Sequence, residues 1–92
     1  REGMDRMATA DELKRAVDLA LSGDWDAAHA IAQRDERDPV HRWLHAVLHK
    51  IEGDDANSRY WYRGSGREPD AFASSQDELQ AIRATLDASP RN

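Results

Sequence analysis

The chain of 92 residues contains no cysteine, which excludes a disulfide framework, a thiolate metal site, an iron–sulfur cluster and a cysteine nucleophile. It also lacks any apolar run close to the roughly 20 residues that cross a bilayer. The first residues have no apolar segment of the kind found in signal peptides. We therefore expect a cytoplasmic protein with no membrane contact.

Basic residues are outnumbered, with 13 Lys and Arg against 18 Asp and Glu and a formal net charge of −5. This balance disfavours a general nucleic-acid binder. β-Branched residues are also scarce, whereas Ala, Leu, Arg and Asp are common, and this composition predicts an all-α fold. The length suits one domain, expected over residues 9–88, with a disordered segment at 1–8 and a frayed tail at 89–92.

The first helical hairpin is predicted over residues 9–34. Thr9 and Glu12 fit a capping box, which would place the first helical residue at about Ala10. Gly23 suits the left-handed residue that ends a helix, and the following aspartate is a good N-cap for a second helix. Because so few residues separate the two helices, they must be antiparallel neighbours.

A second hairpin is predicted over residues 39–64. Pro39 suits a first helical position, and a wide apolar stripe then continues up to Gly53. Asp54 can cap the second helix of this hairpin. A flexible connector at 65–75 should follow, and then a last helix at 76–88, because Ser75 and Glu78 repeat the capping-box pattern.

The two hairpins share a sequence pattern with an offset of 30 residues. Six pairs are identical, more than composition alone would give. They are Ala16/Ala46, Val17/Val47, Gly23/Gly53, Asp24/Asp54, Arg37/Arg67 and Pro39/Pro69. A single hairpin cannot bury its apolar face, so we expect the second to stack on the first and the last helix to cover the exposed end. An apolar end left exposed at the first helix would favour a homodimer.

The run from Gly23 to Ala28 reads Gly-Asp-Trp-Asp-Ala-Ala, which resembles the turn of the tetratricopeptide repeat. Gly53 and Asp54 begin a second copy. The resemblance implies a stack of hairpins whose first helices line a concave surface that binds a protein or peptide. Separately, the block from Trp43 to Arg63 is similar to a group of small bacterial proteins without known activity.

Three histidines, His41, His45 and His49, are spaced by four residues and form one stripe along a helix. Imidazoles at this spacing can share a divalent metal if His29 or Glu52 supplies a further ligand. Helical-wheel arithmetic places the stripe toward a polar boundary rather than in the deep core. Solvated or hydrogen-bonded surface histidines, a metal site and a partner-recognition surface all remain open.

Aromatic and basic residues gather in the second hairpin. If Trp61 packs inward, Tyr60 must point outward, because consecutive helical residues face different directions. The segment Val40–Arg67 carries a local charge of +2. An acidic peptide or protein therefore fits this segment better than single-stranded nucleic acid, which the overall acidity opposes.

No arrangement typical of catalysis is present, so we expect neither enzyme activity nor a cofactor. The predicted function is a small non-catalytic helical repeat module that binds a protein or peptide partner. The alternative is a divalent metal-binding protein or sensor that uses His41, His45 and His49. The expected partner-binding residues are His41, Arg42, His45, His49, Arg59, Tyr60 and Arg63.

Overall fold

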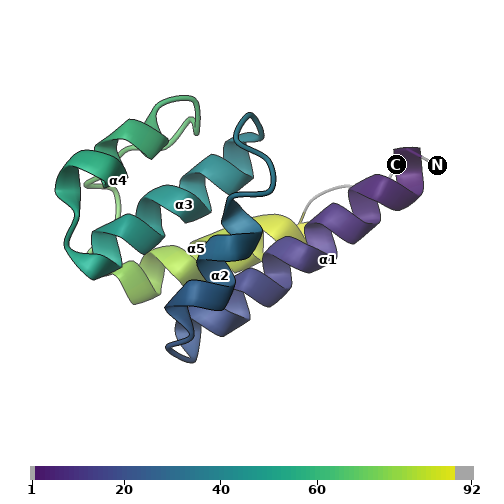
Figure 1. The fold of residues 1–92 in the computed structure, drawn as a ribbon, viewed down its shortest axis with the longest axis horizontal. Coiled ribbons are helices and arrows are strands. Elements are labelled where there is room, and N and C mark those ends of the chain that lie inside the picture. Colours follow the sequence, from purple (N-terminus) through teal and green to yellow (C-terminus); the bar gives the residue numbers. More distant parts are fainter. Residues whose placement is uncertain (1, 89–92) are drawn as a thin grey trace.

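Five α-helices form the regular secondary structure of residues 2–88 in the computed structural model (Figure 1). The structure describes the backbone of residues 2–88 and the side chains of residues 9–88, and the expected frayed tail at 89–92 lies outside the described residues. The all-α prediction is confirmed. The helices are α1 (Glu2–Leu21), α2 (Trp25–Ala32), α3 (Pro39–Glu52), α4 (Asp55–Tyr62) and α5 (Ser75–Ala88).

Helix α1 begins at Glu2, well before the predicted start near Ala10. The predicted capping box is wrong, because Thr9 lies inside the helix and the Glu12 carboxylate instead accepts from Arg34 Nη1 at 2.6 Å. The segment 1–8, for which disorder was expected, is part of α1 from Glu2 onward. Met, Arg and Ala favour the helix in this segment, and no proline interrupts it.

The turns after α1 and α3 are equivalent, as the sequence pattern predicted. Gly23 and Gly53 both adopt left-handed backbone angles, with φ of 94° and 88°. In each turn the glycine N–H donates to the carbonyl of the residue three positions before it. The N–H of the following aspartate donates to the carbonyl five positions before that aspartate. Asp24 and Asp54 then cap α2 and α4, each accepting from the N–H three residues further on. Proline at the start of α3 is also as predicted.

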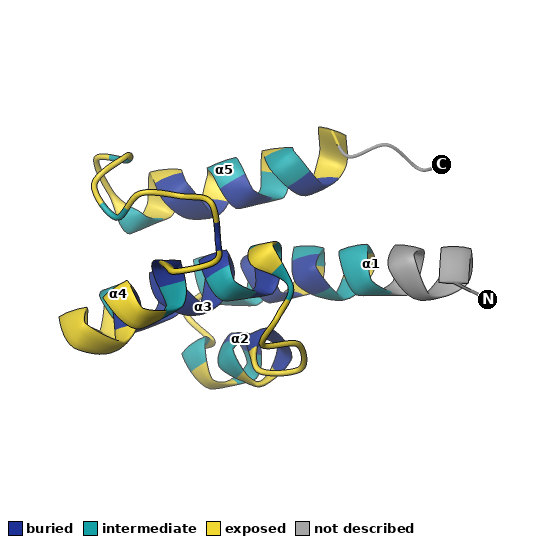
Figure 2. Ribbon diagram, turned by 90° about the horizontal axis from the view of Figure 1, so that it is seen from above, coloured by how far each residue is buried: buried dark blue, intermediate teal, exposed yellow. Residues whose placement is uncertain are grey.

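The helices form layers, with α1 and α3 between α5 on one side and α2 on the other (Figure 2). Helix α2 packs against both α1 and α3, and α4 packs against α3. The last helix was expected to cover the end of the stack. Instead, α5 lies across both α1 and α3, so it covers the face on which the tetratricopeptide-like resemblance placed partner binding.

Apolar residues at helical spacing hold α5 in this position, because Leu79, Ile82 and Leu86 are all buried. An ion pair between Arg83 and Asp18 joins α5 to α1. These contacts extend along the whole helix, which explains why α5 lies across two helices rather than over one end.

Glu78 has a different role from the predicted capping residue. This residue is 0% exposed, and its carboxylate accepts hydrogen bonds from Trp43 Nε1 at 2.9 Å and Tyr62 Oη at 2.6 Å. Lys50 Nζ also donates to the carboxylate at 2.9 Å. The hydroxyl that caps the start of α5 belongs to Ser74, not Ser75. Burial beside Glu78 raises the pKa of the Tyr62 phenol.

The connector between α4 and α5, predicted to be flexible, makes specific contacts with the helices. Phe72 lies against the indole of Trp43, and the guanidinium carbon of Arg67 lies 4.1 Å from the centre of that ring. Gly64 has a φ of 78°, and a Cβ at this position would lie 2.9 Å from Nε of Arg42. The connector therefore passes too close to Arg42 for a larger residue.

The hydrophobic core lies among α1, α2, α3 and α5, with one contribution from α4. The repeat-equivalent pairs Ala16/Ala46 and Val17/Val47 are all 0% exposed. Within the described part of the chain, no helix has the length and apolar character needed to cross a membrane. The buried apolar residues are Leu13, Ala16, Val17, Ala28, Ile31, Ala32, Trp43, Leu44, Ala46, Val47, Leu48, Tyr62, Leu79, Ile82 and Leu86.

Candidate metal centre

The three histidines of α3 are buried, with 2%, 3% and 8% exposure for His41, His45 and His49. The predicted position at a polar boundary is therefore wrong. The prediction considered α3 alone, whereas Trp25 and Trp61 from the neighbouring helices cover this side of it. Buried imidazoles cannot act as contact residues for an external partner in this conformation.

His41 does not join the other two histidines of α3. Its Nδ1 lies 2.8 Å from Oδ2 of Asp38, and its backbone N–H donates to the same carboxylate at 3.0 Å. The hydrogen bond from the His41 side chain is the main reason why the pKa of Asp38 is lowered. His41 thus belongs to the N-terminal cap of α3. The predicted metal set of His41, His45 and His49 is therefore wrong for His41, which lies outside the group of ligand atoms.

His29 of α2 takes the place of His41. Nε2 of His29 lies 3.1 Å from Nε2 of His45, and the ligand atoms of His29, His45 and His49 all lie within 4.8 Å of one another. We call these residues the three-histidine cluster. His45 and His49 share a face of α3 because of their four-residue spacing, and the packing of α2 against α3 brings His29 to them.

Glu52 orients one member of the cluster. Its Oε1 lies 2.5 Å from Nδ1 of His49. Because a carboxylate accepts the proton, Nδ1 is the donor, and in the neutral imidazole Nε2 keeps its lone pair. A carboxylate on the far nitrogen of a histidine is the arrangement that fixes imidazole orientation in many metal sites.

Two indoles enclose the cluster. Trp25 stacks on His29 with ring centres 4.5 Å apart, and Trp61 stacks on His45 at 3.9 Å. The Trp25 ring is itself fixed, because its Nε1 donates to the Leu48 carbonyl at 2.6 Å. These rings limit the rotation of the imidazoles and remove water from their flanks.

The environment favours uncharged imidazoles. Burial lowers the pKa of His45 to about 4, with a smaller contribution from its histidine neighbours. Burial also lowers the pKa of His29, aided by His49. Both pKa shifts favour the neutral imidazole, which is the form of histidine that binds metal ions.

The cluster geometry can be compared with that of a bound ion. Zn–N bonds of 2.0–2.1 Å at tetrahedral angles place two ligand nitrogens about 3.3 Å apart. The 3.1 Å between the Nε2 atoms of His29 and His45 is close to this separation. The third ligand nitrogen, that of His49, lies within 4.8 Å of the other two.

No protein-family model matches this chain, and no curated protein or solved structure matches it either.

A second group of ligand atoms overlaps the first and consists of His49, Glu52 and Asp54. Its carboxylates already have partners, because Glu52 is bonded to His49 and Asp54 accepts from the backbone and side-chain nitrogens of Asn57. These bonds from Asn57 also lower the pKa of Asp54. The three-histidine cluster, with more available lone pairs, is the better candidate.

The non-histidine residues predicted to bind a partner fall into two groups. Arg42 is engaged within the protein, where it donates to the backbone carbonyls of Glu36, Tyr60 and Arg63. Its guanidinium also lies 4.8 Å from the ring centre of Trp61. By contrast, Arg59 and Tyr60 of α4 are exposed, as is Arg63, the residue after this helix. Tyr60 points outward as predicted.

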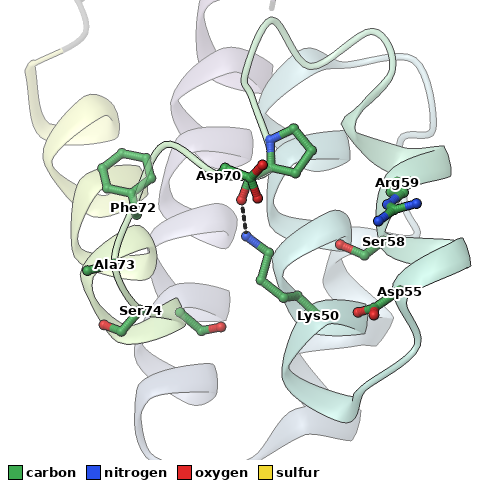
Figure 3. A pocket seen from close by; sticks show the side chains of 10 residues that line it. Lys50, Asp55, Ser58, Arg59, Asp70, Phe72, Ala73 and Ser74 are labelled. Carbon is green, nitrogen blue, oxygen red and sulfur yellow. Dashed lines mark hydrogen bonds between the residues drawn. The ribbon is translucent and has the colours of Figure 1, made fainter.

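A separate pocket of about 490 Å³ lies between α3, α4 and the connector (Figure 3). Lys50 and Phe72 line it, with Arg59 at one side. The Lys50 amine donates to the Pro69 carbonyl at 2.7 Å and to Glu78, so its charge is already satisfied by the protein. None of the three clustered histidines lines this pocket.

Sequence reasoning missed the enclosure of the cluster by Trp25 and Trp61 and the buried role of Glu78. A sequence signal for Glu78 does exist, since it shares a four-residue spacing with Ile82 and Leu86 on the apolar face of α5. The stacking of the indoles has no comparable signal, because it depends on how α2 and α4 pack against α3.

Proposed function

We propose that this protein binds a divalent transition-metal ion through His29, His45 and His49. The observation that carries the proposal is the convergence of three imidazole ligand atoms from two helices within 4.8 Å. The hydrogen bond from His49 to Glu52 and the lowered pKa values of His29 and His45 add support. This role replaces our first expectation, a partner surface that included His41, His45 and His49.

The ligand set favours particular ions. Imidazole nitrogen suits Zn²⁺, Cu²⁺ and Ni²⁺, whereas Mg²⁺ and Ca²⁺ prefer oxygen ligands. A bound ion would join α2 to α3 and thus link the two hairpins. If the ion binds the folded chain but not the unfolded chain, it would stabilise the folded state by about 2.7 kcal/mol at a free metal concentration 100 times the Kd.

Untagged protein, freed of metal with a chelator, provides the test. We expect Zn²⁺ to raise the melting temperature by roughly 10–20 °C at 100 times the Kd, and Mg²⁺ to have no effect. Isothermal titration calorimetry should give one Zn²⁺ per chain. The variant His29→Asn should lose this stabilisation, and circular dichroism without metal would check that it still folds.

His41→Asn is the matched control, because it removes a buried histidine of α3 that lies outside the cluster. It should keep the Zn²⁺-dependent rise in melting temperature even if its metal-free stability falls. Equal melting temperatures with and without excess Zn²⁺ in the wild type would reject the proposal, as would equal responses of the wild type and His29→Asn.

Binding of an acidic protein or peptide is a second candidate function, favoured by the exposed surface of α4. Tyr60 is 52% exposed, and Trp61 and Arg42 hold its ring in place. Arg59 and Arg63 are also exposed and provide positive charge nearby. Because α5 covers the first helices of both hairpins, we place partner binding in this proposal on α4 instead.

Fluorescence anisotropy with a labelled glutamate-rich peptide tests this second function. We expect salt-sensitive binding to the wild type and weaker binding to Arg59→Ala/Arg63→Ala. The control Arg15→Ala/Arg37→Ala removes the same charge from exposed positions elsewhere. Equal weakening by both double variants would show that only net charge matters and would reject a specific surface.

A further inference from the structure

The three-histidine cluster provides fewer ligands than a tetrahedral ion requires. Within residues 9–88 the carboxylates of Glu52 and Asp54, which lie near His49, are already engaged with His49 and Asn57. Structural zinc sites are closed by four protein ligands, whereas sites with three protein ligands keep a position for water or another small ligand.

The position of the cluster allows such a ligand to enter. His29 is only half-buried, and both Asp26 and Glu52 nearby are exposed. The indoles of Trp25 and Trp61 cover the flanks of His29 and His45 but contribute no ligand atom, since indole nitrogen is only a donor. An ion held here would therefore lie close to solvent between two apolar walls.

Charge favours an anion at that position. A metal ion takes imidazole ligands in their neutral form, so three of them leave both positive charges of a divalent ion uncompensated, and the Glu52 carboxylate bonded to His49 offsets only one of them. We propose, on the basis of the metal-binding function above, that the ion keeps one coordination position open and binds a water molecule or a small anion there.

Cobalt-substituted protein tests this inference. Co²⁺ replaces Zn²⁺ at nitrogen sites, and its visible absorption reports the number and type of ligands. We expect Co²⁺-loaded wild-type protein to show a spectrum typical of four-coordination, and azide to change the band position and intensity with a saturable dependence on concentration. His41→Asn should respond to azide like the wild type.

The outcomes separate the two proposals. A Co²⁺ spectrum that azide changes saturably supports the open position. A Co²⁺ spectrum that remains unchanged at saturating azide overturns the open position but keeps the metal-binding function, because it indicates a site closed by the protein. Failure of the wild type to bind Co²⁺ or Zn²⁺ removes both.

Discussion

Nε2 of His29 and Nε2 of His45 lie 3.1 Å apart, although the two residues belong to different helices and different hairpins. Two neutral imidazoles at this distance can form one hydrogen bond between them, or direct both lone pairs at one metal ion. Under the metal-binding proposal, the choice between these states would couple the contact between the hairpins to the availability of the metal.

Loss of the Glu52 carboxylate should weaken metal binding without removing a ligand. We expect Glu52→Gln to raise the Kd for Zn²⁺ by about 10- to 100-fold, because the carboxylate orients His49 and increases its basicity. Competition with a chromophoric chelator measures this Kd. Glu68→Gln, at an exposed position in the connector, is the control and should bind as the wild type does.

Acidification should destabilise the metal-free protein between pH 6.5 and about 4. The pKa of His45 falls from 6.5 in the unfolded chain to about 4 in the folded one, so the folded state resists taking up its proton. The resulting stability is complete above pH 6.5 and is lost as the pH falls toward 4. His29 and His49 face His45 within the cluster, and Arg42 also disfavours its protonation.

Urea denaturation at several pH values in the presence of a chelator measures this dependence. In His45→Gln the loss of stability between pH 6.5 and 4 should be smaller, because the group with the largest lowering of pKa no longer titrates. An identical pH dependence in the variant and the wild type would contradict the assignment. Asp38 should not contribute in this range, since its lowered pKa lies below 3.8.

Removal of the buried Glu78 carboxylate should strongly destabilise the fold. In Glu78→Ala the side chains of Trp43, Tyr62 and Lys50 all lose an acceptor. We expect a loss of about 3–5 kcal/mol in the free energy of unfolding, measured with urea. Gln80→Ala, an exposed change on the same helix, should have little effect. Similar stabilities for the two variants would rule out this role of Glu78.

Alanine substitutions at Gly23 and Gly53 should have matching effects. Both glycines have positive φ, and an added Cβ would meet nothing within 4 Å, so backbone strain alone determines the result. Each substitution should lower the free energy of unfolding by about 1–2 kcal/mol. Chemical denaturation measures both. A large difference between them would indicate that the two turns are not energetically equivalent.

Local features of the fold were predictable from the sequence. The caps at Asp24 and Asp54, the left-handed glycines and the outward Tyr60 follow from interactions among residues close in the chain. The predicted start of α1 was wrong for a related reason. The local pattern at Thr9 fits a helix start, but the same residues also extend a helix that has already begun.

Contacts between distant segments limited the prediction of the site. The burial of His45 depends on Trp61 and Trp25, which reach α3 only when α2 and α4 pack against it. His29 was recognised as a source of a further ligand, but nothing in the sequence distinguishes its position from that of His41. That distinction follows from how α2 packs against α3, together with the bond from His41 to Asp38.

Glu78 also determines how the chain can be divided. A fragment containing only the two hairpins would leave the apolar face under α5 exposed to water, and the indole, phenol and ammonium groups on it would lose the Glu78 acceptor. The hairpins are therefore not interchangeable building blocks that could be excised or multiplied. The last helix and the residues before it must fold together, as one cooperative unit.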